Sequence, residues 1–103
     1  MRRIVLLLPI LFTIPAVASE AGATLYRQKT CASCHGADGS GNTPAGKSLK
    51  ARDLRSADVQ KQSDDELAAA IANGRGKMPA FKNSLPAEQI RELVAHIRTL
   101  GKS

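Results

Sequence analysis

The chain has 103 residues, of which 43% are hydrophobic, 3% are aromatic and 23% are charged. This length supports one small domain, which can bury only a modest core. The formal net charge of +6 favours an acidic partner, but no nucleic-acid recognition motif accompanies it, so we expect no binding to nucleic acid.

Residues 1–18 have the three parts of a secretory signal peptide. Two arginines follow Met1, an apolar stretch comes next, and the small-residue cleavage site Ala16-Val17-Ala18 ends the segment. An uncleaved membrane anchor is the alternative, but the apolar stretch is interrupted by prolines and is shorter than the roughly 20 residues of a membrane span. We therefore expect general secretion, a cleaved leader over 1–18, one domain over 19–103 and a periplasmic location. Loss of two arginines leaves 13 basic against 9 acidic residues, a charge of +4.

The first predicted helix runs from Glu20 to about Thr30, because Ala21, Leu25 and Tyr26 follow helical spacing. It leads directly into a cysteine-containing motif.

The motif Cys31-Ala32-Ser33-Cys34-His35 matches a c-type haem attachment site. Two thiols on one turn can each form a thioether with a haem vinyl group, and the histidine that follows can bind the iron as proximal ligand. A bare C-x-x-C could also be half of a zinc site or a thioredoxin-like motif. Those alternatives need a second ligand pair or a βαβ context, and the chain has only these two cysteines and a helical pattern.

Residues 36–46 are rich in glycine and are predicted to be a loop that wraps one edge of a haem. A short turn or helix is expected near residues 56–61. Ser63 and Glu66 have the spacing of a capping box, so the next helix should begin at Asp64 and end near Asn73, before Gly74. The apolar stripe of that helix is assigned to core packing and consists of Leu67, Ala70 and Ile71.

Met78 is the only methionine after the initiator, and it lies in the segment Gly74-Arg75-Gly76-Lys77-Met78-Pro79-Ala80-Phe81. The glycines and the proline predict a loop that can approach a ring closely. A lone methionine often fills a gap in a core. Beside a haem motif, however, a methionine thioether is a common sixth iron ligand, and we favour that role.

The last predicted helix is the clearest element of the pattern. Pro86 lies near its first turn, apolar residues follow at helical spacing, and Gly101 ends it. These apolar residues are Ile90, Leu93, Val94 and Ile97.

Through the haem motif, the Met78-Pro79 loop and the final helix, in that order, the chain resembles the class I monohaem cytochromes c of the small bacterial, cytochrome c6-like group. The resemblance implies an all-α, compact cytochrome c fold with four or so helices around one covalent haem c. It implies thioethers from Cys31 and Cys34 and axial iron ligands from His35 and Met78. It also implies a soluble electron carrier, not an enzyme.

The resemblance further implies that the first and last helices cross, with Gly22 and Tyr26 meeting Leu93. His96 departs from the family, which usually has an aromatic residue there, so it is interpreted as a helix contact in place of a ring. Sixth-ligand and pH-sensitive roles remain as alternatives for His96. In the family a proline carbonyl orients the proximal histidine, and Pro44 is the only candidate here, although a plain turn role is equally open.

Two functional classes follow: a soluble one-electron carrier, or a small haem enzyme or ligand sensor in which Met78 dissociates. An electron-entry module of a larger complex is a variant of the first class. Basic residues near the haem edge favour redox partners with acidic docking surfaces, although plain solubility also explains them; they are Lys29, Arg75, Lys77 and Lys82. We expect a monomer without stable membrane insertion, whose haem-free form is largely unfolded because the core is small.

Overall fold

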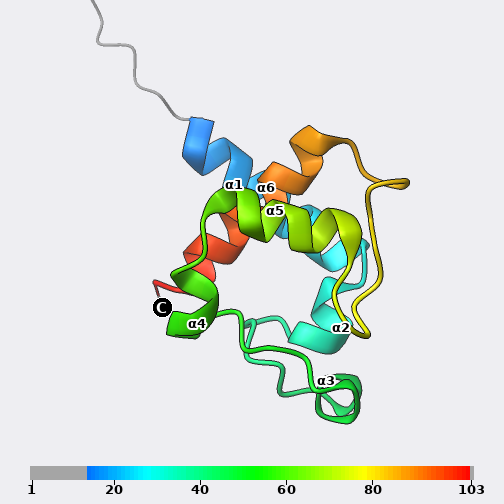
Figure 1. The fold of residues 1–103 in the computed structure, drawn as a ribbon. Coiled ribbons are helices and arrows are strands. Elements are labelled where there is room, and N and C mark those ends of the chain that lie inside the picture. Colours follow the sequence, from blue (N-terminus) through cyan, green and yellow to red (C-terminus); the bar gives the residue numbers. More distant parts are fainter. Residues whose placement is uncertain (1–13, 103) are drawn as a thin grey trace, which may run out of the picture.

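The computed structural model describes residues 14–102, which form six helices and one isolated bridge between Arg75 and Met78. Three of these helices are long, and the three short ones all lie in the connection between the first two long ones, whose course can be followed in Figure 1. This confirms the all-α prediction, with short helices in addition to the expected four or so. The helices are α1 (Ile14–Gln28), α2 (Cys31–His35), α3 (Pro44–Leu49), α4 (Ala57–Gln60), α5 (Asp64–Asn73) and α6 (Ala87–Leu100).

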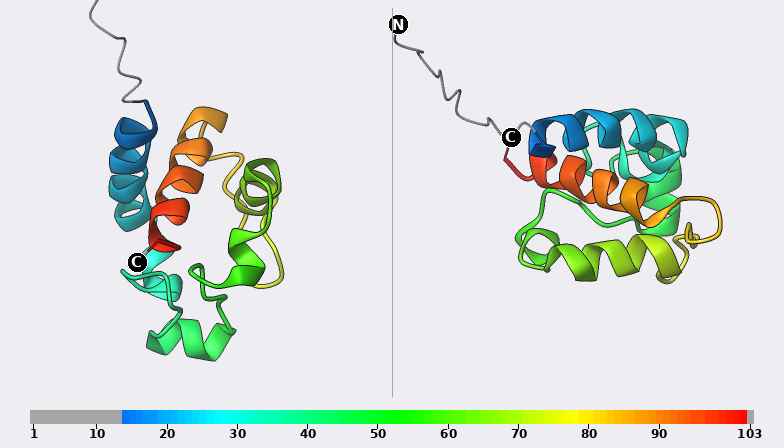
Figure 2. Two further views of the ribbon diagram at one scale, coloured as in Figure 1. Left: turned by 90° about the vertical axis from the view of Figure 1, so that its left-hand side faces the viewer. Right: turned by 90° about the horizontal axis from the view of Figure 1, so that it is seen from above.

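Helix α6 lies between α1 and α5 in both views of Figure 2. This position explains its sequence pattern, because apolar residues three and four apart form one continuous stripe along a helix. The predicted core residues of α6 are all buried, and Leu93 is only 1% exposed. The buried hydrophobic side chains of the three long helices are Leu25, Tyr26, Leu67, Ile71, Ile90, Leu93, Val94 and Ile97.

The crossing of α1 and α6 follows the expectation. Gly22 lets the main chains touch, since a Cβ at this position would overlap the carbonyl group of Glu92. One turn later, the rings of Tyr26 and His96 pack with their centroids 4.8 Å apart and their planes tilted by 57°. His96 therefore takes part in the crossing of α1 and α6 through a ring contact, as expected.

The first predicted helix is interrupted before the haem motif. Helix α1 ends at Gln28, and α2 begins only at Cys31, after Thr30 with a left-handed φ of 64°. A left-handed residue breaks the helical path and changes the direction of the chain. The motif therefore begins a new short helix instead of continuing α1, which the apolar spacing alone did not reveal.

The predicted loop over residues 36–46 is too long. Helix α3 begins at Pro44, and the Thr43 side chain caps it by accepting a 2.8 Å hydrogen bond from the Gly46 N–H. Proline in the first turn and threonine at the cap are both helix-start signals, and here they outweigh the glycine content. The Thr43 hydroxyl also donates to the carbonyl of Ser33 at 2.8 Å, which fastens α3 to α2.

The start and end of α5 confirm the capping-box prediction. The Glu66 N–H donates to Ser63 Oγ at 3.0 Å, and the Ser63 N–H donates to Glu66 Oε1 at 2.9 Å. These reciprocal bonds hold the pKa of Glu66 below its usual value. The helix ends at Asn73, and Gly74 follows with a φ of 76°.

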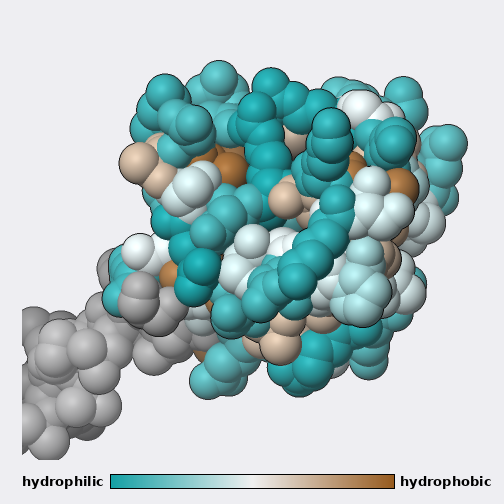
Figure 3. All heavy atoms as spheres, turned by 90° about the horizontal axis from the view of Figure 1, so that it is seen from below, coloured by the Kyte–Doolittle hydropathy of each residue, from teal (hydrophilic) through white to brown (hydrophobic). Residues whose placement is uncertain are grey.

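The predicted leader lies mostly outside the described residues, and its last five residues, 14–18, belong to α1. Over residues 14–102, no helix has both the length and the apolar character of a membrane span. Seen from below in Figure 3, hydrophilic residues cover most of this face, and apolar residues are visible only in small areas between them.

Candidate haem site

A cavity of about 640 Å³ lies between α2, α5 and α6. Its volume falls in the range of about 300–1,000 Å³ that is usual for cofactor sites. The wall is mainly apolar, which suits a flat hydrophobic group that must be kept from water. The apolar wall residues from several elements are Leu49, Leu54, Val59, Leu67, Ala70, Ile71, Phe81, Leu93 and Ile97.

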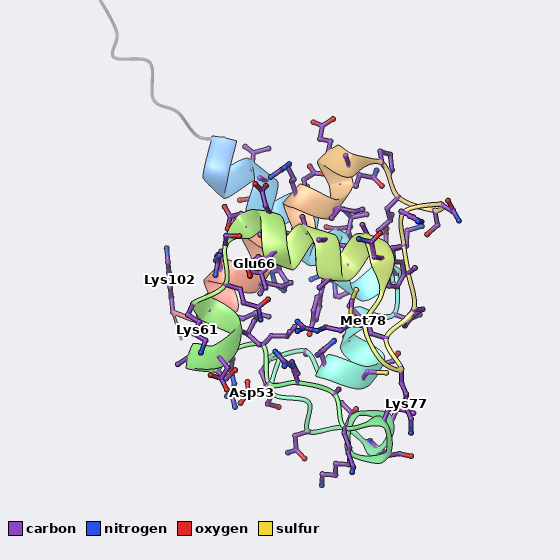
Figure 4. All side chains as sticks on the ribbon, viewed as in Figure 1. Asp53, Lys61, Glu66, Lys77, Met78 and Lys102 are labelled. Carbon is purple, nitrogen blue, oxygen red and sulfur yellow. The ribbon has the colours of Figure 1, made fainter. Side chains whose placement is uncertain are left out.

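The four predicted haem-binding residues all line this cavity: Cys31, Cys34 and His35 from α2, and Met78 from the loop after α5. The two cysteines are three residues apart, so the helix presents them on one face. Figure 4 shows Met78 on the loop that descends from the end of α5 toward α2. The fold thus brings together donors that are far apart in the sequence.

The imidazole of His35 is oriented by a main-chain carbonyl. Its Nδ1 lies 3.0 Å from the carbonyl oxygen of Arg52. A carbonyl can only accept, so Nδ1 carries the proton and Nε2 keeps a free lone pair for a metal. Of the two roles left open for Pro44, the carbonyl role is wrong because Arg52 supplies the acceptor, and Pro44 instead occupies the first turn of α3.

The loop that carries Met78 is a tight turn tied to α5. The main chains of Arg75 and Met78 exchange hydrogen bonds of 3.1 and 2.9 Å, and Gly76 between them has a left-handed φ of 56°. Beyond the turn, the Phe81 N–H donates to the carbonyl of Ile71 at 3.1 Å. These main-chain bonds fix the position of Met78 relative to α5 and the cavity.

The environment of the Cys31 thiol differs from that of a redox-active cysteine. Burial raises the pKa of the Cys31 thiol, with a smaller effect in the same direction from Cys34. Catalytic thiols in C-x-x-C redox motifs have lowered pKa values instead. Within residues 14–102, no three His, Cys, Asp or Glu side chains gather as a metal cluster.

Tyr26 connects the helix crossing to the haem motif. Its hydroxyl is buried and donates a 2.6 Å hydrogen bond to the carbonyl of Gly36, directly after His35. Burial, with smaller contributions from Cys31 and Asp38, raises the pKa of Tyr26 well above its usual value, so the donor proton is retained. Tyr26 also forms part of the cavity wall.

Some contributions to the site were missed from the sequence. Leu67, Ala70 and Ile71 were assigned to core packing alone, yet all three line the cavity. The small side chain of Ala70 could have indicated this role from the sequence, because it leaves room for a haem to lie against α5. The role of the Arg52 carbonyl had no sequence signal, because any residue provides a carbonyl.

His96 lies against Tyr26 and is not among the residues that line the cavity. Burial, together with the nearby charge of Arg27, lowers the pKa of His96. This placement favours the helix-contact interpretation over a role as sixth ligand.

Comparisons with known proteins agree with this geometry. The model of the family described as cytochrome c oxidase, cbb3-type, subunit III matches residues 17–97. A cytochrome c6 of Nostoc sp. is 38% identical over 94 residues, which span 89% of this chain and 79% of the relative. A cytochrome c6 of Anabaena variabilis is 38% identical over 85 residues, or 82% of this chain and 92% of the relative. The solved structure named KustC0563 c-type cytochrome has a TM-score of 0.70 and 37% identity, covering 77% of this chain and 95% of that one.

A helical fold with an apolar cavity that is lined by the C-x-x-C-H motif has the features of a protein that binds haem covalently. The chain belongs to the class I c-type cytochromes and is similar to the cytochromes c6. Its cofactor is accordingly one covalently bound haem c, and the residues of the cavity fit that group in volume, polarity and donor set.

Proposed function

We propose that the protein is a diffusible one-electron carrier in which Cys31 and Cys34 hold the haem through thioethers and His35 and Met78 are the axial iron ligands. The observation that carries this proposal is that all four side chains line one apolar cavity. Thiols, an imidazole and a thioether are the donor set of a c-type haem with His/Met ligation. The bound haem supplies an iron that takes up and releases one electron.

In this function the protein holds the two proposed iron ligands, His35 and Met78, in fixed orientations. The Arg52 carbonyl keeps the proton of His35 on Nδ1, which leaves Nε2 to bind metal. Met78 offers a neutral, soft sulfur donor, which favours the ferrous state and raises the reduction potential. The turn from Arg75 to Met78 holds this sulfur in place, so little rearrangement is needed when the charge of the site changes.

The cavity wall keeps water from the site. Apolar side chains from α4, α5 and α6 surround the donors, and such a shell raises the cost of extra charge and tunes the potential. In this proposal no substrate bond is made or broken, so the protein is a carrier and not an enzyme.

Basic side chains at the rim of the cavity favour docking to an acidic partner. Lys50, Arg52, Arg75 and Lys77 all line the cavity and are exposed to solvent. A positive rim steers an encounter with a negatively charged protein surface and brings the electron-carrying group to the contact. We propose redox proteins with acidic surfaces as partners of a monomeric carrier that does not bind nucleic acid.

We also propose that the leader is cleaved after Ala18 and that the mature protein is periplasmic. Cleavage there would leave α1 to begin at Ser19. The residues by which α1 contacts α6 and the haem motif, Gly22, Leu25 and Tyr26, all follow this point. The mature domain therefore keeps the contacts on which its fold depends.

Carbon monoxide binding tests this proposal, because it shows whether the haem iron has a free coordination position. Carbon monoxide binds ferrous haem only where a ligand is absent or leaves readily, so the wild-type protein should bind it poorly and Met78→Ala should bind it fully. His96→Ala is the matched control, because it removes the only other imidazole beside His35 and should leave carbon monoxide binding at the wild-type level. Rapid, complete binding by the wild-type protein would contradict the carrier and favour an open-site haem enzyme or sensor.

A further inference from the structure

The carbonyl that orients His35 belongs to a connecting segment without regular structure, so something must hold it in position. Arg52 lies between α3 and α4, and its own side chain is exposed. Two residues later, Leu54 is 9% exposed and is fixed through its main chain. The Leu54 N–H donates to the carbonyl of Gly39 at 2.7 Å, and the Leu54 carbonyl accepts a bond of 2.8 Å from Nε2 of Gln60.

Gln60 uses both of its amide hydrogens in this part of the fold. Nε2 donates to the carbonyl of Leu54 at 2.8 Å and to the carbonyl of Ile97, on α6, at 3.0 Å. The main-chain carbonyl of Gln60 accepts a 2.8 Å bond from Nη1 of Arg98. One side chain at the end of α4 thus ties the Arg52–Leu54 segment to the central helix.

Gly101 provides an independent indication that the position of this amide matters. Its φ of −69° and ψ of −11° are ordinary right-handed values that any residue adopts, so its conformation does not require glycine. A Cβ at this position would lie 2.7 Å from both Nε2 and Oε1 of Gln60. Glycine at 101 therefore leaves the space that the Gln60 amide occupies, and even alanine would displace that amide.

We propose that Gln60 is a positioning residue for the haem ligand His35: its amide holds the Arg52–Leu54 segment so that the Arg52 carbonyl accepts the Nδ1 proton. This rests on the proposed function, in which His35 binds the iron. A firm bond from Nδ1–H to a carbonyl makes Nε2 a stronger electron donor, which stabilises the ferric state. Loosening the Arg52 carbonyl should therefore raise the reduction potential.

The experiment measures the reduction potential of the holoprotein in Gln60→Leu, Gly101→Ala and the double variant. Leucine keeps much of the side-chain volume but has no donor, and Gly101→Ala leaves Gln60 in the chain but takes its space. Each single variant should shift the ferric–ferrous equilibrium toward ferrous by about three- to tenfold, tenfold being 59 mV for one electron. Because both act through one amide, the double variant should shift no further than Gln60→Leu alone.

Ser63→Ala is the matched control. It removes the N-cap of α5, and so loosens a neighbouring cavity wall, without touching Leu54 or Arg52. It should lower thermal stability while leaving the potential at the wild-type value. The Nδ1 proton of His35, followed by NMR in the ferrous protein, should exchange with solvent faster in Gln60→Leu than in Ser63→Ala.

Wild-type potentials in Gln60→Leu and Gly101→Ala would overturn the role of Gln60 and leave the carrier proposal standing. Equal potential shifts in Ser63→Ala and Gln60→Leu would also overturn it, since a general loosening of the wall would then explain both. A wild-type spectrum without a histidine-bound iron would overturn this inference together with the proposed function, and the unmutated protein alone would show it.

Discussion

Replacing Gly22 with alanine should destabilise the protein, because α1 and α6 touch through their main chains at this point. An added Cβ would overlap the carbonyl oxygen of Glu92 and lie 2.6 Å from its carbonyl carbon. Close carbon–oxygen contacts in proteins lie at about 3.3–3.6 Å, so the two helices would have to move apart to admit the methyl group. Main-chain atoms of two packed helices cannot make that change locally, in contrast to the end of a flexible side chain.

The magnitude follows from two opposing effects. Overpacking a well-packed core costs about 1–3 kcal/mol, and a main-chain clash of this size belongs at about 3 kcal/mol. The better helix propensity of alanine over glycine recovers about 1 kcal/mol. The net loss is about 2 kcal/mol, which lowers the Tm of a domain of this size by about 8–16 °C.

Thermal unfolding of the holoprotein, followed by circular dichroism, measures this loss. Gln28→Ala, at an exposed position of α1, controls for helix propensity and should leave Tm nearly unchanged. Adding Glu92→Ala to Gly22→Ala should not restore stability, because the clash involves the main chain of Glu92. A Tm of Gly22→Ala at or above the wild-type value would refute the close crossing of α1 and α6.

Three further predictions concern charge and the haem. Burial and the charge of Arg27 lower the pKa of His96 in the folded protein, so protonation of His96 opposes folding. The free energy of unfolding, measured in urea, should therefore fall as the pH drops through about 6.5, and it should fall less in His96→Tyr. Equal pH profiles for the two proteins would contradict this. Lys77→Glu should slow electron exchange with an acidic partner roughly tenfold at low salt in stopped-flow experiments, and an unchanged rate there would end the docking proposal. Protein expressed without haem should show no cooperative thermal transition, since the cavity would lack its filling; a cooperative one would be the contrary result.

Local signals in the sequence predicted the bounds of α5 and α6 well. The capping box of Ser63 and Glu66, the stop at Gly74 and the apolar stripe of α6 depend on residues within one or two turns, and the structure confirms each of them. The close approach at Gly22 and the contact of Tyr26 with His96 were expected through the family resemblance.

The remaining features depend on long-range geometry. The break at Thr30 follows from the direction that α2 must take relative to α1, and the apolar spacing of α1 carries no trace of it. The acceptor for His35 is a main-chain carbonyl that residue identity does not mark, so the sequence offered a proline as candidate and gave no indication of Arg52. Gly101 ends α6 as predicted, but its second role depends on the fold: its lack of a side chain makes space for Gln60, which lies 41 positions earlier in the sequence.

The ferric optical spectrum tests most directly whether His35 and Met78 both bind the iron and leave it no free coordination position. A bond between iron and the Met78 sulfur should give a weak far-red absorption band in the wild-type holoprotein, and Met78→Ala should abolish it while the haem stays attached. His96→Ala should keep the band. A c-type haem that lacks the band in the wild-type protein, with a high-spin ferric spectrum, would contradict ligation by Met78.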